Sequence, residues 1–418
     1  MIATALILLA LIGVSFYSRI HGIGLWLVIL VTHGILYQVF GKETQHLPLF
    51  SGIILLVIAI ACKQWSEISI NVVASLIILL SMMGLASLFG INQQSSVISL
   101  ILYVRCFVMA IFIMGSVRNE NDLRIITIYC LVGIAIGALS GLYQYKTGKF
   151  SIGTVYDQRA ASLRGDPNDT AMILVAGVPL GIYWLGQAKR QVMRLVVAVL
   201  LVLILFGVIL TFSRGGFVSL CLVMLMYLRR PKLKIVLVGL AVALAIVSLA
   251  PRSYWTRMHT LISGHEEHGG SSLHEREMLL RTGLTMFAEH PIFGVGPGNY
   301  GLSFGNYYAR KNGVQMSQVN LADPVYPAAH NMYLEFFVEN GVFAGTLLLA
   351  ILGWAVRCLF KLDDSAGQES NAIKLGHSTA CALGGMLIAG VFLSQGLNSV
   401  LWFLVGLGFS AQKMPKQE

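Results

Sequence analysis

The sequence HNMYLEFFVENG occupies residues 330–341 and opens a long apolar stretch that continues past Gly341. The residues before it, 251–329, form the one extended hydrophilic insert of a chain that is otherwise largely apolar. A histidine therefore stands where a polar insert meets a segment suited to a membrane. This boundary predicts a site at the edge of a bilayer, beneath a folded outer loop.

Composition indicates that lipid is the main solvent of this chain. Of its 418 residues, 56% are hydrophobic and 11% are charged, and the mean hydropathy is +0.76. Because about 20 apolar residues cross about 30 Å of hydrocarbon, most of the apolar segments can span a bilayer. We therefore expect an all-α fold: a polytopic transmembrane helix bundle of about 12–13 segments, with one large periplasmic helical insert. The segments are 3–18, 21–40, 47–62, 70–90, 96–116, 123–143, 170–186, 193–211, 215–228, 233–250, 330–357, 376–394 and 397–411, of which 47–62, 215–228 and 397–411 are short enough to be half-helices.

Basic residues in short loops set the expected orientation, because cytoplasmic loops are enriched in Lys and Arg. If the segments alternate, these residues fall on one side, which is then cytoplasmic: Lys189, Arg190, Arg194, Arg229, Arg230, Lys232, Lys234, Arg357, Lys361, Lys374, Lys413 and Lys416. Three regions follow. We expect transmembrane helices in 1–250 with an outward loop at about 144–169, a periplasmic insert in 251–329, and C-terminal transmembrane helices in 330–418.

The net charge of +10 does not indicate a nucleic-acid partner, because the insert is neutral and the excess is mostly the orientation signal. The six cysteines lie in or at the ends of apolar segments, and no Cys/His spacing suits zinc. His265, His268 and His274 could ligate a metal, but the Gly-Gly-Ser-Ser stretch among them is typical of a loop. We expect no metal and no cofactor.

Arg214 interrupts the apolar run 193–228, within Thr211-Phe212-Ser213-Arg214-Gly215-Gly216. That run barely suffices for two spans, so the break must be tight, and paired glycines permit a sharp turn. Arg214 then lies at the outer edge of the hydrocarbon, where charge is costly and usually functional or paired. It either extends to lipid phosphates or is held rigidly to bind a diphosphate in a bidentate way.

The insert is predicted to contain its own helix. Ser272 with Glu275 forms a capping box, and the helical pattern runs to Glu289 before His290-Pro291 ends it. Arg276 falls inside its apolar arc and either faces what that arc covers or forms a structural ion pair, whereas Arg281 lies on the polar flank. The arc comprises Leu273, Leu279, Leu280, Leu284, Met286 and Phe287. The glycines of the following 291–299 stretch either bind an anion through backbone N–H groups or form a plain turn.

His330 and Asn331 are predicted to occupy the first turn of a transmembrane helix. The positive end of the helix dipole there favours neutral imidazole, which can accept a proton as a general base must. A cap or hydrogen-bond bridge is the structural alternative. Gly341 falls three turns on, on the same face, where a neighbouring helix can pack closely. Glu335 and Glu339 lie inside the apolar stretch and need partners.

The outward loop at about 144–169 adds Arg159, Arg164, Asp166 and Asn168 just ahead of an apolar segment. Asp166 or Asn168 can cap the helix that follows, and the two arginines can enlarge a basic lining for phosphate. We therefore expect His330, Arg214 and Arg276 to be catalytic. The expected substrate-binding residues are Arg159, Arg164, Asn168, Asn331, Arg281 and Glu335.

Taken in order, these elements resemble the O-antigen ligase and Wzy-type polymerase superfamily of bacterial membrane glycosyltransferases. Arg159 to Asn168 looks like its R…(N/D)PN element, and Ser213-Arg214-Gly215 looks like its SRG element. Arg276 resembles the arginine of its external helix, and His290 to Gly296 its HP-x-x-G-x-G element. His330-Asn331 to Gly341 fits the ligase pattern of His, then Asn, Ser or Gln, nine residues, and Gly.

The resemblance implies transfer of a glycan from undecaprenyl diphosphate to a hydroxyl, with inversion and without metal or nucleotide, by a multi-pass protein of the bacterial inner membrane whose site faces the periplasm. The expected partners are the lipid-linked glycan donor, a hydroxyl-bearing acceptor such as lipid A core, and the bilayer. A ligase is favoured by the His-Asn-x9-Gly pattern, and a polymerase of the same superfamily is the alternative. A transporter or flippase is disfavoured because its polar groups should lie at mid-membrane.

Overall fold

The computed structural model describes residues 2–62, 67–148, 166–227, 272–312, 328–361 and 371–413. Within these ranges the chain is built from helices. Their bounds are α1 Ile2–Tyr17, α2 Arg19–Phe40, α3 Leu47–Ala61, α4 Ile70–Leu88, α5 Gln93–Ser116, α6 Glu120–Thr147, α7 Pro167–Gln187, α8 Gln191–Leu210, α9 Arg214–Tyr227, α12 Ser272–Glu289, α13 Tyr300–Asn312, α14 Met332–Lys361, α15 Asn371–Ala389 and α16 Ser399–Ser410.

Eight of the described helices are long and apolar enough to cross a membrane, and four shorter apolar helices accompany them. The short ones are α1, α3, α9 and α16, so the three segments predicted to be short are confirmed. Twelve of the thirteen apolar segments thus appear as helices, while the segment 233–250 lies outside the described residues. The expected all-α polytopic bundle is confirmed.

Helix α16 forms the centre of the bundle although it is only 12 residues long. Nearly all of its side chains are buried, as expected for a helix that is apolar on every side. Gly406 lies against the backbone of Ala110 in α5, and Gly408 lies against the backbone of Ala355 in α14. These glycines allow close packing, as small residues do between membrane helices.

The bundle has two chemically different ends. At one end, which we call the basic end, Gln187 at the close of α7 donates to Asn371 at the start of α15 (2.9 Å). The described basic residues of the short loops gather at this end, because α7, α14 and α16 end there and α8 and α15 begin there: Lys189, Arg190, Arg194, Arg357, Lys361, Lys374 and Lys413. At the opposite end, the site end, α7, α9 and α14 begin and α15 finishes.

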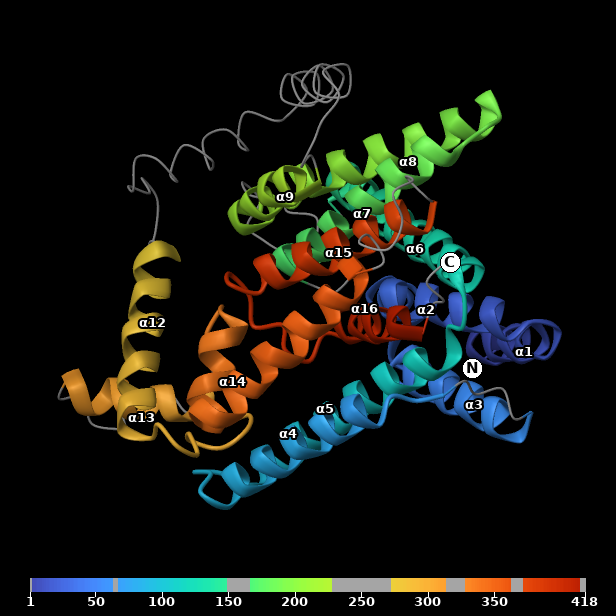
Figure 1. Cartoon of the computed structure of the whole chain (residues 1–418). Helices are drawn as coiled ribbons and strands as arrows, with labels where there is room; N and C mark the ends of the chain where they lie inside the picture. Colours follow the sequence, from blue (N-terminus) through green and yellow to red (C-terminus); the bar gives the residue numbers. More distant parts are fainter. Residues whose placement is uncertain are drawn as a thin grey trace.

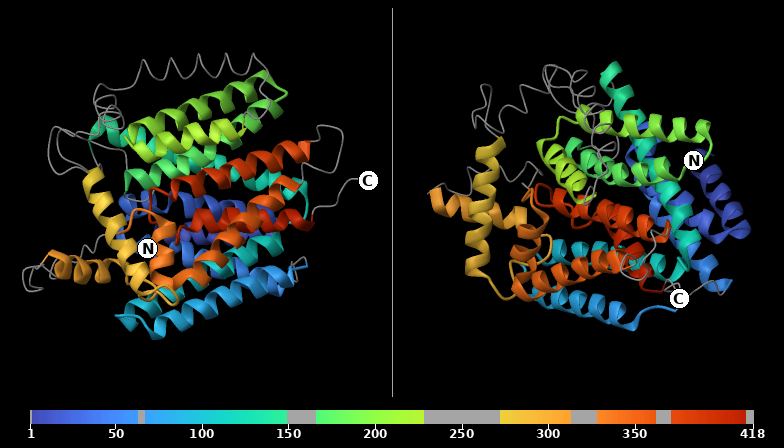
Figure 2. Two further views of the ribbon diagram at one scale, coloured as in Figure 1. Left: turned by 60° about the vertical axis from the view of Figure 1, so that its left-hand side comes forward. Right: turned by 45° about the horizontal axis from the view of Figure 1, so that its top comes forward.

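The insert helices α12 and α13 lie across the site end, beside the start of α14, and α12 crosses the direction of the bundle (Figures 1 and 2). The predicted insert helix is confirmed, with its end at Glu289 as expected. Leu279, Met286, Tyr300, Phe304 and Val338 form a small core of their own between α12, α13 and α14. The insert is therefore packed onto the bundle.

Candidate active site

The turn before α9 is built by side chains and by one unusual backbone conformation. Phe212 has φ 51°, and the Ser213 hydroxyl accepts from the Gly216 N–H (3.1 Å) while donating to Oδ1 of Asn168 (2.8 Å). Ser213 thus caps α9 and ties its start to the start of α7. Arg214 is the first residue of α9 and is only 8% exposed. A guanidinium is therefore fixed where two helix starts meet, which favours an anion.

The role predicted for the paired glycines is wrong. Gly215 and Gly216 lie inside the first turn of α9, and the turn is made by Phe212 instead. A Cβ on Gly215 would be 2.9 Å from Cβ of Phe392, and a Cβ on Gly216 would be 2.6 Å from Cβ of Ala171. The glycines are needed for close packing against neighbouring segments.

The start of α14 also differs from the prediction. Asn331 is the N-cap: its Oδ1 accepts from the N–H groups of Tyr333 and Leu334, each at 3.0 Å. His330 precedes the cap and has φ 49°, so it lies outside the helix. The imidazole therefore belongs to the segment that leads into α14 and not to the first turn of that helix.

Glu335 fixes the chain around His330. Its carboxylate accepts from the hydroxyl of Ser394 and lies close to the backbone of Ala329. His330 thus lies between the buried Ala329 and the capping Asn331. Within the described ranges, Phe212 and His330 are the two non-glycine residues with positive φ. Such conformations cost about 1–3 kcal/mol and tend to mark functional sites.

The loop 390–398, between α15 and α16, joins the two helix starts. Its Phe392 packs on Gly215, next to Arg214. Its Gly390 carbonyl accepts from the N–H of Met332 (2.8 Å), two residues after His330. Arg214 and His330 are therefore neighbours of one short loop at one end of the bundle.

Helix α12 packs beside the start of α14, with Arg276 on the packed face. Gly283 lies against Leu334 and the Phe287 ring contacts the Phe337 ring (6.0 Å), so α12 and the first half of α14 run side by side in the same direction. Two turns before Gly283, half-buried Arg276 falls on the same face, level with the chain that precedes Met332. Arg276 thus lies on the face of α12 that packs against α14.

The predicted apolar arc of α12 is partly wrong. Leu279 and Met286 are buried with Thr282 and Gly283, whereas Leu280 and Leu284 are 44% and 52% exposed. The buried stripe is narrower because α14 covers only one side of the helix and because small residues let it approach. The side chain of Leu273 lies outside the described residues.

Arg281 is not gathered with the other arginines. It lies on the outer side of α12 and pairs with Glu277 one turn earlier (2.6 Å), with both side chains more than half exposed. Exposed pairs of this spacing contribute little to stability. Its predicted part in substrate binding gains no support from this position.

The glycine-rich stretch after α12 binds the protein itself. Val295 and Gly296 donate their N–H groups to the carbonyls of Val338 (2.9 Å) and Glu339 (3.0 Å). The Tyr300 N–H donates to the Glu339 carboxylate (3.0 Å), which provides that buried acid with a partner. The backbone of this stretch therefore bonds other parts of the protein.

Gly341 is a kink and not part of a helical packing face, which corrects the prediction. Its φ of 78° and ψ of 178° fall in a region that is essentially reserved for glycine. A Cβ there would be 1.9 Å from the carbonyl oxygen of Ile292. The close approach was expected, but the partner is the glycine-rich loop and the helix is interrupted.

Tyr300, at the start of α13, joins the insert to α12. Its hydroxyl donates to the Leu279 carbonyl (2.7 Å). Burial, reinforced by the nearby carboxylates of Glu335 and Glu339, raises the pKa of the Tyr300 hydroxyl. The hydroxyl therefore stays protonated and keeps this bond over the whole physiological pH range.

Some predicted residues cannot be placed. Arg159, Arg164, His265 and His268 lie outside the described residues, as does the side chain of His274. Asp166 caps α7 through the N–H groups of Asn168 (2.6 Å) and Asp169 (3.3 Å), which leaves the Asn168 side chain to Ser213. In the described part of the chain, no group of three His, Cys, Asp or Glu residues is arranged to hold a metal ion.

Sequence patterns did not reveal Phe212, Phe392 or Ser394. Each acts through a contact between segments far apart in the chain, so local spacing carries no signal of it. Only the polar character of Ser394 inside an apolar segment hinted at a partner.

Part of the chain matches a known protein family. Residues 198–349 match the model Wzy_C, described as O-Antigen ligase, and this stretch contains Arg214, Arg276, His330 and Gly341. No curated protein matches the chain. Over this stretch the chain is similar to the O-antigen ligase family, and the resemblance of its sequence to the O-antigen ligase and Wzy-type polymerase superfamily is confirmed there.

Proposed function

We propose that this membrane protein transfers a glycan from undecaprenyl diphosphate to an acceptor hydroxyl at the periplasmic face of a bacterial inner membrane. The acceptor that we propose first is lipid A core. The family consists of glycosyltransferase-like enzymes, which supports the reaction class. The observation that carries the proposal is the loop 390–398, which contacts the start of α9 beside Arg214 and the start of α14 beside His330.

The chemistry needs a base on one side of the anomeric carbon and a cation on the other. The acceptor oxygen attacks that carbon, its proton passes to neutral His330, and the bond to the diphosphate oxygen breaks with its electron pair. Arg214 and Arg276 stabilise the charge that develops on the leaving diphosphate, the role that divalent ions have elsewhere. Attack opposite the leaving group inverts the anomeric centre.

The remaining residues support these three. Asn331 and Glu335 fix the backbone on both sides of His330, and Asn168 anchors Ser213 beside Arg214. Their contribution to substrate binding is therefore mainly to hold the catalytic groups in place. In this proposal, Arg159 and Arg164 extend the basic lining that binds the diphosphate. Among the residues predicted to bind substrate, Arg281 has the least support.

The regions and their orientation follow the same scheme: transmembrane helices in 1–250 and 330–418, with 251–329 in the periplasm. Support comes from the gathering of described Lys and Arg residues at the basic end, because such residues favour the cytoplasm. The site end then faces outward, where both the lipid-linked donor and a finished acceptor are accessible.

The test is a reaction with purified protein in nanodiscs, a polyprenyl-diphosphate glycan and lipid A core, with and without chelator. We expect product in both, with inverted anomeric configuration by NMR, and none from His330→Ala or Arg214→Ala. Arg194→Ala, at the basic end, is the control for loss of one arginine. Loss of product on chelation would exclude the metal-independent mechanism, and activity in both variants would exclude the site.

A polymerase of the same superfamily is distinguished by the acceptor. If a second lipid-linked glycan is extended while lipid A core is not, the ligase assignment is wrong and the glycosyl-transfer site stands. If neither acceptor reacts but labelled donor crosses the membrane of proteoliposomes, the transporter alternative replaces both.

A further inference from the structure

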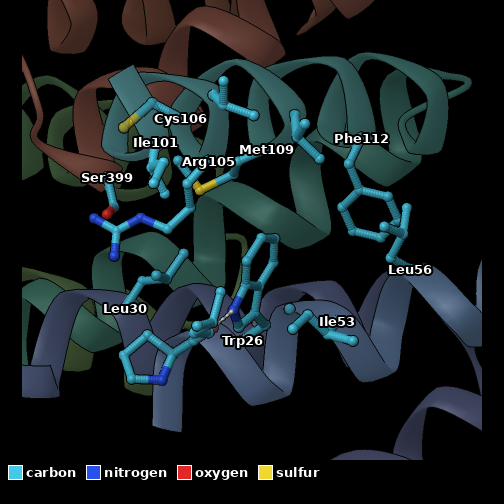
Figure 3. A pocket seen from close by; sticks show the side chains of 15 residues that line it. Trp26, Leu30, Ile53, Leu56, Ile101, Arg105, Cys106, Met109, Phe112 and Ser399 are labelled. Carbon is cyan, nitrogen blue, oxygen red and sulfur yellow. Dashed lines mark hydrogen bonds between the residues drawn. The ribbon is translucent and has the colours of Figure 1, made fainter. Parts of the chain in front are cut away.

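A cavity on the flank of the bundle has a charged end and an apolar end. It measures about 310 Å³ and is enclosed by α2, α3 and α5, with the first residue of α16 at one edge. Figure 3 shows the guanidinium of Arg105 turned toward Ser399 at one end, while Leu56 and Phe112 lie at the other. Such a lining matches an amphiphile: an anionic group at one end and a hydrocarbon chain at the other.

The charge of Arg105 lies at a position where its burial in hydrocarbon costs free energy. It occupies the middle of the 24-residue helix α5 and is exposed on the side of the bundle. Across the described ranges no carboxylate pairs with it. A charge at that depth is rare and usually has a partner.

Helix α3 brings the membrane surface toward this arginine. It has 15 residues and is therefore about 22 Å long, less than the about 30 Å of hydrocarbon. A bilayer thins beside short segments. The exposed polar residues Lys42, Glu43, Gln45 and His46 directly precede the cavity wall at Pro48, so the polar boundary reaches the cavity.

The direction of α5 decides which leaflet supplies the occupant. Helix α5 begins at the site end, where Asn299 of the insert bonds Asn92 just ahead of it (3.1 Å). Ile101 and Arg105 are therefore nearer the site end than Met109 and Phe112 are. A lipid of the leaflet at the site end fits with its phosphate at Arg105 and its chain toward Phe112.

We propose that this cavity binds one anionic phospholipid of the bilayer, whose phosphate pairs with Arg105 and Ser399 and whose acyl chain lies between α3 and α5. The exposed charges of Lys42 and Glu43 offset each other, which leaves Arg105 as the cation that the cavity presents. A guanidinium binds phosphate in a bidentate way, and neither group then stays uncompensated in hydrocarbon. The inference does not rest on the proposed glycosyl transfer.

Trp26 provides the measurement, because it lines the cavity and its indole N–H is bonded to the Pro48 carbonyl (3.0 Å). Protein in an uncharged detergent is titrated with phosphatidylglycerol bearing brominated chains, which quench nearby tryptophan. The Trp26 signal is the difference between the wild type and Trp26→Phe, since the chain has six tryptophans. We expect saturable quenching, at a concentration about tenfold lower than that of brominated diacylglycerol with the same chains.

Three variants separate the two halves of the site. Arg105→Gln should remove the preference for the phosphate lipid and leave quenching by diacylglycerol unchanged. Ile53→Phe, which narrows the apolar half, should weaken both lipids, and Arg194→Gln, an exposed arginine at the basic end, should change neither. Size-exclusion profiles and thermal unfolding show that each variant is folded.

Equal quenching by both lipids in the wild type would overturn the proposal, as would an unchanged preference in Arg105→Gln. An unlabelled polyprenyl phosphate that displaces brominated phosphatidylglycerol well below equimolar amounts would also overturn it, because the occupant would then be an isoprenoid. Glycosyl-transfer activity enters none of these outcomes.

Discussion

The two ends of the bundle are made from the same helices but differ in how their most prominent polar residues are placed. At the site end, Ser213 and Glu335 bond residues of other segments, Asn331 caps its own helix, and Phe212 and His330 have positive φ. At the basic end, Lys189, Arg190 and Arg194 are, by contrast, largely exposed. The site end holds these polar groups in place, whereas these three basic residues of the opposite end are exposed.

This difference teaches where exact geometry matters. The exposed lysines and arginines of the basic end act through their total charge, so any one of them is replaceable. Positioned groups act through their location, and a displacement of about 1 Å can cost about 100-fold in rate. Matched substitutions at the two ends should therefore have very different effects on glycosyl transfer, although the residue types are the same.

The largest expected difference in activity is between substitutions of two histidines, one at each end of the bundle. His330→Asn removes the base while keeping a residue type that tolerates positive φ, so activity should fall about 10²–10⁴-fold with little change in stability. His377, at the basic end, packs between the rings of Tyr227 (5.5 Å) and Phe360 (5.6 Å). His377→Asn should lower thermal stability, and the turnover of the correctly folded variant should stay within about twofold of the wild type.

Initial rates and thermal unfolding of both variants, measured on the same preparations, decide this point. If His330→Asn retains more than a tenth of the activity, the imidazole is not the base. A comparable loss in His377→Asn would mean that the two ends do not differ in the way described.

The arginines come next. Arg214→Lys keeps the charge but loses the planar fork, and we expect turnover to fall about 10²–10³-fold while the protein stays folded. Arg194→Lys at the basic end should have no measurable effect. The comparison is made on kcat at saturating donor, because a group that acts mainly in the transition state lowers kcat. A rise in KM alone would make Arg214 a binding residue only.

The third pair lies within α14. Gly341→Ala forces a Cβ to within 1.9 Å of the Ile292 carbonyl and a backbone that alanine avoids, so we expect a loss of about 1–3 kcal/mol in stability. Gly353→Ala, farther along the same helix, meets open space and should be neutral or slightly stabilising. Thermal unfolding in one detergent gives both values, and equal melting temperatures would contradict the role of the kink.

Much of the fold was predictable because hydropathy and capping are local. The spacing of apolar segments located twelve helices, and Ser272 with Glu289 bracketed α12 as expected. The candidate residues Arg214 and His330 stood out because charge and imidazole are conspicuous at the ends of apolar runs. These signals need no knowledge of the rest of the chain.

The details of the site were not predictable in the same way. Nothing in the sequence marks Phe212 as a residue with positive φ. The glycines next to Arg214 therefore lead to the prediction of a turn at the wrong residues, since Phe212 makes it. Gly341 was assigned to a helix face because its partner, Ile292, comes from a separate segment. Arg105 is inconspicuous in the sequence because a single charge hardly lowers the hydropathy of a long apolar segment, and the cavity beside it is visible only in the structure.

The smallest expected effect sharpens the comparison inside the insert, where two arginines share one helix. Arg276 lies on the face of α12 that turns to α14, and Arg281 lies on the outer face with Glu277. Arg276→Gln should lower kcat about tenfold through the loss of one charged hydrogen bond to the leaving group, whereas Arg281→Gln should stay within about twofold. Rates at saturating donor, with unfolding curves for both variants, provide the measurement. Equal losses would restore Arg281 to substrate binding and would mean that the whole of α12, and not one face of it, borders the donor.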